Sequence, residues 1–297
     1  MKKQRFYHLG LTGYPLTHSL SPQLHAAALR SLALIGEYRL YPILPEDQPG
    51  LGGLLNSLRT GELDGLNVTL PHKEAVIPWL DELSPVARSV GAVNTVFRRD
   101  GRLFGENTDV PGFWADLEKH FFSDPGTSVR GRCAQEAQKK ALVLGAGGAA
   151  RAVVFALNAH GWQVTLAARQ RDQAERLIQS LGQVPGIASP RPELLEAGAL
   201  EPFLDDYGLI VNATPVGMEP DIDHSPWPKG LPFPRAASVY DLIYNPGETL
   251  LLRQARAAGL RAVSGLGMLV EQAALSFEIW TGRVPSREGM WTAVEAG

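Results

Sequence analysis

The feature that most constrains the fold is a short apolar run followed by a glycine-rich turn and a helical pattern, in ALVLGAGGAARAVVFAL at residues 141–157. The turn consists of Gly145, Ala146, Gly147, Gly148 and Ala149. In such a unit the first glycine permits the tight turn, the second lets a pyrophosphate approach the backbone, and small residues let helix and strand pack closely. The segment predicts a dinucleotide-binding βαβ unit, with a glycine-rich turn that binds nothing as the alternative.

The end of the next predicted strand, QVTLAAR at residues 163–169, indicates which dinucleotide binds. About twenty residues after the glycine turn, an NAD-binding unit carries an Asp or Glu for the ribose hydroxyls. Ala168, Arg169 and Gln170 stand there instead, and Asp172 lies too far into the following helix to replace the acid. Because an arginine can pair with a 2'-phosphate, we expect NADP rather than NAD, with a solvated Arg169 as the alternative.

The chain as a whole alternates between strand-like and helix-like segments, which predicts an α/β fold with largely parallel sheets. Its 297 residues are enough for about two domains. We expect an open α/β substrate-binding domain at 1–113 and a Rossmann-type, doubly wound dinucleotide-binding domain at 114–264, with a cleft between them. Residues 265–297 are helical, with a break at 282–285, and by periodicity could pack on either domain.

The individual elements follow from apolar periodicity and turn residues. In the first domain we expect strands at 6–13, 37–43 and 63–70, a hairpin that turns at Asp100-Gly101, and helices at 22–35, 47–60, 71–80 and 110–122. In the second we expect strands at 141–145, 163–169, 209–214, 237–244 and 260–265, and helices at 148–159, 171–181 and 248–258. The polar segment 123–140 between them is expected to be a surface loop or linker.

Composition narrows the classes of partner. The net charge is -3 and no stretch is a basic run, so we expect a small-molecule substrate and neither nucleic acid nor an anionic membrane surface. We expect no export signal, because the first residues lack an uninterrupted apolar stretch, and no run of about 18 apolar residues is present that could cross a bilayer. The single cysteine, Cys133, cannot form an internal disulfide or a thiolate metal cage, which fits a reducing cytoplasm. Monomer and homodimer both remain open.

Polar residues in the first domain gather at the ends of predicted elements, where open α/β sheets bind their ligands. They are Ser19, Ser21, Asn67, Thr69, Asn94 and Asp109. Several have a local alternative, since Ser21 precedes a proline as a helix N-cap does, and Thr69 and Asp109 could cap the helices that follow them. Asn67 and Asn94 are harder to explain locally because they interrupt apolar strands.

Lys73 lies in NVTLPHK, residues 67–73, which has the spacing of a strand that turns into a helix. The unpaired N–H groups and the positive dipole end of a helix start disfavour an ammonium group. Partly desolvated there, Lys73 could exchange protons near neutral pH, as a general acid or base must, although Asp109 nearby would partly oppose this effect. The alternative is an ordinary solvated surface lysine.

Eight blocks, in order along most of the chain, resemble the shikimate dehydrogenase family. They are GYPLTHSLSPQLH, GLNVTLPHKEAV, GAVNTV, GENTD, LGAGGAARAV, NATPVGM, DLIYNPGETLLL and SGLGMLVEQAALSFEIWTG. The resemblance implies reversible hydride transfer between NADPH and the ketone of 3-dehydroshikimate, which gives shikimate for chorismate and aromatic amino acid biosynthesis, with no metal. It also implies that the final helices, about 266–297, return to the first domain.

The resemblance further implies a role for individual residues. Lys73 and Asp109 match the catalytic pair, and Ser19 and Ser21, helped by Tyr244 of the second domain, match the residues that hold the substrate carboxylate. The residues that match ring-hydroxyl ligands are Asn67, Thr69, Asn94, Asp109 and Gln272. In the cofactor domain the glycine turn matches the pyrophosphate site and Arg169 the adenosine phosphate clamp. The residues in motifs that line the nicotinamide pocket are Thr214, Met218, Gly265 and Met268.

Three residues depart from the family pattern, at two places in the sequence. Ala168 and Gln170 flank the arginine where the family's strand usually ends Asn-Arg-Thr, which could weaken the preference for NADP. His72 stands where phenylalanine or tyrosine is also common, and we expect it to be exposed at a helix start without a role.

Two rival functions remain open. An NAD-linked quinate/shikimate dehydrogenase is opposed by the missing acid after the second strand of the cofactor domain. A non-catalytic metabolite-sensing protein would be expected to have lost Lys73 or Asp109, and both are present.

Overall fold

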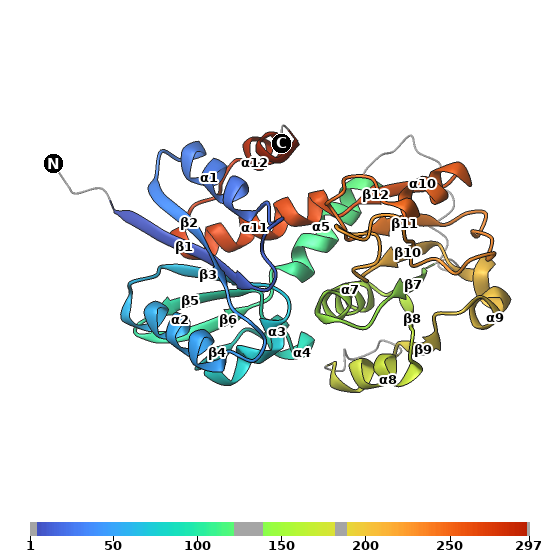
Figure 1. Cartoon of the computed structure of the whole chain (residues 1–297), viewed down its shortest axis with the longest axis horizontal. Coiled ribbons are helices and arrows are strands. Elements are labelled where there is room, and N and C mark those ends of the chain that lie inside the picture. The colour runs from blue at the N-terminus through green and yellow to red at the C-terminus, as the bar shows by residue number, and fades with distance from the viewer. Residues whose placement is uncertain (1–4, 122–138, 182–188, 296–297) are drawn as a thin grey trace. The chain divides into compact units, whose positions relative to one another are not determined.

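The computed structural model describes residues 5–121, 139–181 and 189–295. The chain forms two compact units (Figure 1), which we call unit 1 (residues 1–112 with 270–297) and unit 2 (residues 113–269). Both boundaries fall inside helices, α5 (Asp109–Phe121) and α11 (Leu266–Thr281). Residues 122–138, which include Cys133 and most of the expected linker, lie outside the described residues.

Unit 1 is built on a mixed, mainly parallel sheet with strand order β2-β1-β3-β5-β6-β4. Its strands are β1 (Phe6–Gly13), β2 (Ile35–Pro42), β3 (Gly65–Val68), β4 (Glu82–Leu83), β5 (Thr95–Arg99) and β6 (Arg102–Glu106). β1 pairs in parallel with β2 and β3, whereas β5 is antiparallel to both β3 and β6. The carboxyl ends of β1, β3 and β6 therefore lie at the same edge of the sheet as the start of β5.

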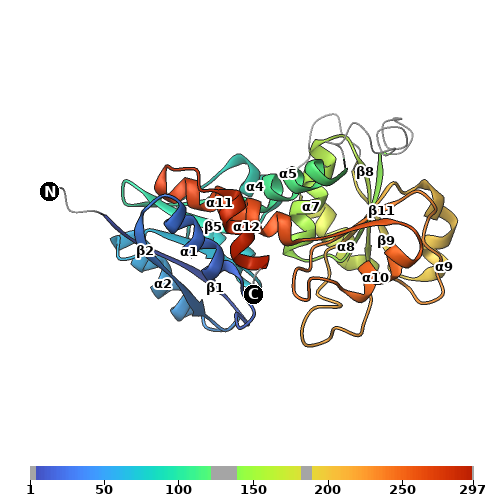
Figure 2. The same cartoon turned by 90° about the horizontal axis from the view of Figure 1, so that it is seen from above.

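The helices that lie wholly within unit 1 are α1 (Ser21–Ser31), α2 (Gln48–Thr60), α3 (His72–Ala75), α4 (Pro85–Val90) and α12 (Arg287–Glu295). Helix α2 buries Leu51, Leu55 and Leu58, whose spacing puts them on one face against the sheet core. Figure 2 shows α12 beside α1, so the last helix of the chain packs on the first.

The hairpin expected between β5 and β6 is confirmed. Its two turn residues, Asp100 and Gly101, have φ angles of 51° and 75°. Two successive residues with positive φ form the turn whose twist matches that of paired strands, and Asp-Gly is a preferred sequence for it.

The helix expected at 71–80 is much shorter than predicted. Helix α3 has four residues, and Ile77–Trp79 forms a 3-10 turn instead of a further helical turn. Pro78 accounts for the difference, because a proline within a helix lacks the N–H donor and its ring clashes with the carbonyl of the preceding turn.

Unit 2 has a fully parallel sheet with strand order β12-β11-β10-β7-β8-β9. Its strands are β7 (Lys140–Leu144), β8 (Gln163–Ala168), β9 (Arg191–Leu194), β10 (Leu209–Asn212), β11 (Ser238–Asp241) and β12 (Arg261–Ser264). Numbered within the unit, this is the order 6-5-4-1-2-3 of a doubly wound dinucleotide-binding sheet. The predicted fold class, two α/β units with mainly parallel sheets, is confirmed.

The helices of unit 2 are α7 (Gly148–Ala159), α8 (Arg171–Ser180), α9 (Ala197–Leu200) and α10 (Leu250–Ala257), with a 3-10 segment at Glu201–Asp206. The expected helix at 148–159 is confirmed with the same bounds. Within 5–121, 139–181 and 189–295, no helix is long and apolar enough to span a membrane.

Candidate functional site

In unit 1 the polar residues predicted to bind the ligand lie at the edge of the sheet where β1 and β3 end. The turn after β1 leads to Ser19 and Ser21, and the backbone N–H of Ser21 donates to the Ser19 hydroxyl at 3.3 Å. Thr69 follows β3, and its N–H donates to the carbonyl of Thr12 in β1 at 2.8 Å. Because Thr12 is paired with Val68 in the parallel ladder, the two segments leave the sheet side by side.

The β5–β6 hairpin brings Asn94 and Asp109 together. Thr95 is paired with Glu106 in the antiparallel register, so the residue before β5 faces the residues after β6. The amide oxygen of Asn94 accepts the backbone N–H of Thr108 at 2.7 Å, which fixes the orientation of the amide. Its nitrogen then faces Asp109 and donates to the carboxylate at 2.9 Å.

Lys73 donates from its ammonium Nζ to the other carboxylate oxygen of Asp109 at 2.6 Å. The side chains of Lys73 and Asp109 are only 17% and 7% exposed. The carbonyl of Lys73 accepts the N–H of Val93 at 2.8 Å, which ties the short helix α3 to the segment that carries Asn94. A four-residue helix has little dipole, so the ion pair with Asp109 dominates the surroundings of Lys73.

Asn67 is linked to this group through Asn94 and is 5% exposed. Its amide oxygen accepts the hydroxyl of Tyr38 at 2.8 Å, and its nitrogen donates to the carbonyl of Asn94 at 3.1 Å and to the hydroxyl of Ser276 at 3.0 Å. These contacts leave the Asn67 amide little capacity for a ligand. Asn67 therefore belongs to a buried network beneath the ion pair.

Helix α11 supplies two members of the same network. The Asn94 amide nitrogen lies 3.4 Å from Oε1 of Gln272, and Ser276 also lies 2.7 Å from the hydroxyl of Thr95. Sequence reasoning singled out Gln272 through the family resemblance but missed Tyr38, Thr95 and Ser276. The only sequence signal of Thr95 and Ser276 is a polar side chain at an otherwise apolar position of a strand or helix, and Tyr38, between Glu37 and Arg39, has no such signal.

His72, expected to be exposed, is buried, so that prediction is wrong. Its side chain is 1% exposed, and Nε2 lies 2.8 Å from the carbonyl oxygen of Ile43. The short α3 turns this ring inward against the end of the β2 segment. The capping alternatives also fail for two residues, because α1 has Leu20 and α3 has Pro71 at the N-cap position, each without a side-chain cap. Asp109 begins α5 and directs its carboxylate to Lys73 and Asn94.

His25 is a second buried histidine of unit 1. It is 0% exposed, stacks on Tyr38 with ring centroids 4.2 Å apart, and packs against Trp280. Both of its ring nitrogens are buried without a hydrogen-bond partner in the described part of the chain. Burial lowers the pKa of His25 to about 3, so the ring is neutral at physiological pH.

Unit 2 carries the glycine turn at the carboxyl end of β7. Gly145 has a φ of 101°, which favours glycine, and a Cβ at this position would lie 2.8 Å from Cγ2 of Thr214. A Cβ at Gly147 would meet nothing within 4 Å, so the turn is open there. Helix α7 starts at Gly148 without a side-chain cap, which leaves first-turn N–H groups facing that opening. These features fit a pyrophosphate.

The other predicted cofactor residues lie at the same carboxyl edge of unit 2 or just beyond it. Arg169 follows β8 and is exposed, while Thr214 and Met218 follow β10, and Met218 is 43% exposed. Gly265 directly precedes α11, and a Cβ at Gly265 would lie 2.3 Å from the carbonyl oxygen of Leu242. Met268 is buried in the first turn of α11.

Tyr244 lies beyond β11 and belongs to unit 2, whereas the two serines belong to unit 1. Burial raises the pKa of the Tyr244 phenol, which keeps its hydroxyl protonated as a hydrogen-bond donor.

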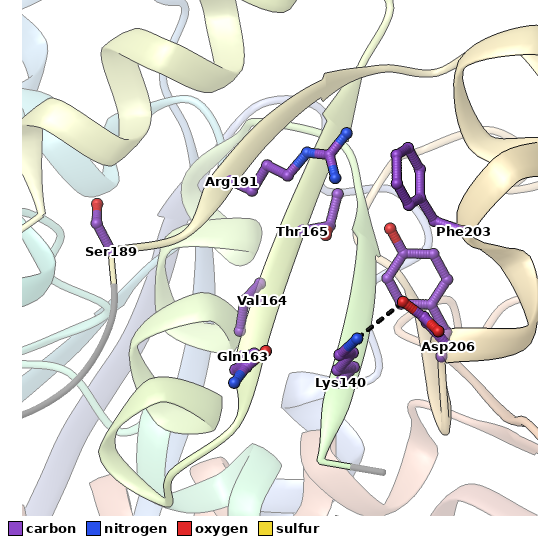
Figure 3. A pocket seen from close by; sticks show the side chains of 9 residues that line it. Lys140, Gln163, Val164, Thr165, Ser189, Arg191, Phe203 and Asp206 are labelled. Carbon is purple, nitrogen blue, oxygen red and sulfur yellow. Dashed lines mark hydrogen bonds and ion pairs between the residues drawn. The ribbon is translucent and has the colours of Figure 1, made fainter. Parts of the chain in front are cut away.

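A hollow of about 190 Å³ lies elsewhere in unit 2. Figure 3 shows the side chains that line it. Lys140, Gln163 and Arg191 begin β7, β8 and β9, so this hollow lies at the amino ends of the strands. Lys140 is paired with Asp206 at 2.8 Å. Because ligands of such sheets bind at the carboxyl ends, we assign this hollow no part in dinucleotide binding. In the described ranges, no cluster of three or more His, Cys, Asp or Glu residues could hold a metal ion.

Comparison with known proteins gives a consistent result. Residues 11–96 match a family model described as shikimate dehydrogenase substrate binding domain, and residues 265–295 match one described as shikimate 5'-dehydrogenase C-terminal domain. A shikimate dehydrogenase (NADP(+)) of Salinibacter ruber is 44% identical over 96% of each chain.

Two solved structures are similar over nearly the whole chain. Shikimate 5-dehydrogenase of Thermus thermophilus, in complex with NADP(H) and shikimate, is 40% identical with a TM-score of 0.79, covering 98% of this chain and 99% of that one. Quinate dehydrogenase of Corynebacterium glutamicum, in complex with NAD, is 29% identical with a TM-score of 0.83, covering 99% of this chain and 100% of that one.

Proposed function

The chain belongs to the shikimate dehydrogenase family and is an NADP-dependent oxidoreductase, and on this basis we propose that it catalyses the reversible reduction of 3-dehydroshikimate to shikimate with NADPH. The observation that best supports the proposal is the Lys73–Asp109 ion pair, which is shielded from solvent at the edge of unit 1 where ligands of α/β sheets bind.

Lys73 is the proton donor in our proposal. When bound, NADPH supplies the hydride that reduces the ketone. Negative charge then develops on the carbonyl oxygen, and the ammonium group of Lys73 stabilises that charge and transfers a proton to the oxygen. In the reverse direction the amine of Lys73 accepts the proton of the hydroxyl group.

Asp109 and its neighbours hold the proton donor in place. The Asp109 carboxylate receives Lys73 on one oxygen and Asn94 on the other, at 2.6 and 2.9 Å. Because the Thr108 N–H fixes the amide of Asn94, the carboxylate cannot rotate without losing one of its two partners. An ammonium group held this way can meet a reacting oxygen without first being ordered.

The remaining residues bind and orient the ligands in the proposed enzyme. Ser19, Ser21 and Tyr244 take the substrate carboxylate, and Thr69, Asn94, Asp109 and Gln272 take ring hydroxyls. Asn67 has its amide engaged by protein groups, and its contribution is to support Asn94 from below. The first turn of α7 would hold the pyrophosphate, and Arg169 would hold the 2'-phosphate. The single cysteine supports a cytoplasmic location.

The second candidate, an NAD-linked quinate dehydrogenase, is favoured by one observation. The similar quinate dehydrogenase of Corynebacterium glutamicum is complexed with NAD. Against it stands Arg169 at the end of β8, where an acid would serve NAD.

The test is a rate assay of shikimate and of quinate, each with NADP⁺ and with NAD⁺, followed by the absorbance of the reduced nicotinamide. We expect shikimate with NADP⁺ to have a kcat/KM at least about tenfold above every other combination. A higher kcat/KM for quinate with NAD⁺ would establish the second candidate. A chain that binds shikimate without turnover in any combination would be a sensing protein.

A further inference from the structure

Asp241 and Asn212 form a buried polar pair at the carboxyl ends of β11 and β10. Both side chains are 0% exposed. The Asp241 carboxylate accepts the amide nitrogen of Asn212 at 2.8 Å, the hydroxyl of Thr249 at 2.6 Å and the N–H of Ile243 at 3.1 Å. All three partners are neutral. Burying a carboxylate among neutral groups costs free energy, so stability alone does not explain why this residue is an aspartate.

The Asn212 amide can adopt only one orientation. Its oxygen accepts both the backbone N–H of Thr214 at 2.9 Å and the hydroxyl of Thr214 at 2.7 Å. Its nitrogen must then face Asp241, where it finds an acceptor. Rotating the amide by half a turn would bring its N–H groups against the two Thr214 donors. Asp241 thus fixes Asn212, and Asn212 fixes Thr214 through two contacts.

Thr214 in turn forms one wall of the glycine turn. A Cβ at Gly145 would lie 2.8 Å from Cγ2 of Thr214 and 3.1 Å from the carbonyl of Ala213. The N–H of Ala213 donates to the carbonyl of Leu144, the residue before that turn, at 2.9 Å. A movement of Thr214 by a few tenths of an ångström would therefore reach the backbone that accepts the pyrophosphate.

From this chain of contacts we infer that Asp241 and Asn212 are positioning residues for the cofactor, holding Thr214 against the Gly145 turn. The inference rests on the proposed use of that turn for NADP. Thr249 extends the arrangement, because its hydroxyl also accepts the N–H of Leu252 as the N-cap of α10. One carboxylate thereby ties the loops after β10 and β11 to the turn after β7.

The test compares Asp241→Leu, which removes every acceptor while keeping the branching at Cγ and the number of side-chain heavy atoms, with Asp241→Asn, which keeps one amide oxygen for Asn212 and Ile243. NADP⁺ affinity is measured by titration calorimetry without substrate, and the KM for shikimate is measured at saturating NADP⁺. We expect Asp241→Leu to raise the NADP⁺ dissociation constant about tenfold, Asp241→Asn less than about threefold, and neither to change the shikimate KM more than about twofold.

Asp206→Leu is the matched control, since Asp206 lies at the opposite edge of the same sheet and its side chain is 53% exposed. It should bind NADP⁺ as the unaltered chain does. Thermal unfolding followed by circular dichroism establishes which variants fold. If Asp241→Leu does not fold, Asn212→Ala takes its place, and we expect it to raise the NADP⁺ dissociation constant about tenfold because it removes the contacts to Thr214 directly.

Folded variants that bind NADP⁺ as well as the unaltered chain would overturn the inference. A rise in the shikimate KM as large as the rise in the NADP⁺ dissociation constant would also overturn it, since it would indicate general structural damage. Failure of the unaltered chain to bind NADP⁺ would instead overturn the proposed cofactor.

Discussion

Lys73 differs in its surroundings from Lys140, the other lysine of the ion pairs found among the described residues. Its pair with Asp109 is 17% and 7% exposed, whereas the Lys140–Asp206 pair is 37% and 53% exposed. Charges interact more strongly as water is removed, so the first pair holds its ammonium group in one place and the second contributes little.

We expect Lys73→Ala to lower kcat by about 10² to 10⁴, the usual contribution of a positioned acid or base, while the KM for shikimate stays within about threefold. Steady-state kinetics on shikimate with NADP⁺ measure both values. Lys140→Ala, which removes a lysine from the solvent-exposed pair, should change neither. A variant with normal kcat and a raised KM would make Lys73 a binding residue only.

His25 makes the stability of unit 1 depend on pH. Its pKa is about 3 in the folded chain and 6.5 when solvated. Between these values the unfolded chain binds more protons than the folded one, so the free energy of unfolding falls as pH is lowered. The slope from this one group reaches about 1.4 kcal/mol per pH unit.

Urea unfolding at pH 7.5 and at pH 5 would measure this effect, and His25→Phe is the informative variant because a phenyl ring can keep the stack on Tyr38. The unaltered chain should lose about 1 to 2 kcal/mol more than His25→Phe does over this interval. An equal loss in both proteins would mean that other groups carry the pH dependence.

At the scale of elements, α5 and α11 approach closely within unit 1. A Cβ at Gly112 would lie 2.9 Å from both the backbone N and Cβ of Gln272. Contacts under 3.0 Å to backbone cannot be relieved by turning a flexible side chain, so one of the helices would have to move. Because position 112 is a glycine, α11 can lie close enough to α5 for the side chain of Gln272 to contact Asn94.

Gly112→Ala should therefore raise the KM for shikimate by about tenfold and lower the free energy of unfolding by about 1 to 3 kcal/mol. Kinetics and urea unfolding give the two values. Gly101→Ala is the control, because Gly101 has a positive φ but open space around it, and it should cost stability by about 1 kcal/mol without a change in KM. An unchanged KM in Gly112→Ala would show that Gln272 does not need this contact.

Elements with a strong local pattern were predictable from the sequence, and those set by tertiary contacts were not. The glycine turn with α7 and the Asp100-Gly101 hairpin carry their own signals and form as expected. The two-residue β4 and the edge strand β9, which contains Pro192, have too few residues to show periodicity.

The same distinction applies to the site. Lys73 and Asp109 were found because their motifs are specific. The burial of His72 and the supporting contacts of Tyr38 and Ser276 depend on segments far apart in the sequence, which no local pattern reports.

At the scale of the whole molecule, unit 1 combines two separate parts of the chain, and unit 2 is formed by the residues between them. Each unit has its own sheet, and each carries most of the residues proposed for one ligand, the substrate for unit 1 and NADP for unit 2. A ligand that binds only the folded state raises stability by an amount set by its concentration relative to its dissociation constant.

NADP⁺ at about one hundred times its dissociation constant should stabilise unit 2 by about 2.7 kcal/mol. Shikimate at about one hundred times its own dissociation constant should stabilise unit 1 by the same amount. Hydrogen exchange followed by mass spectrometry, with each ligand alone, assigns the protection to peptides of each unit. Protection by NADP⁺ that is confined to residues 5–112 would contradict the assignment of the cofactor to unit 2.

The contribution of residues 270–297 to unit 1 also has a consequence during translation. Trp280 packs on Gly65 and donates to the carbonyl of Val96 at 3.1 Å, so the apolar face made early in synthesis stays uncovered until the segment with Trp280 leaves the ribosome. At typical elongation rates this delay is on the order of ten seconds. A nascent chain in that interval presents a natural target for a chaperone, and a prematurely terminated one presents a target for proteolysis.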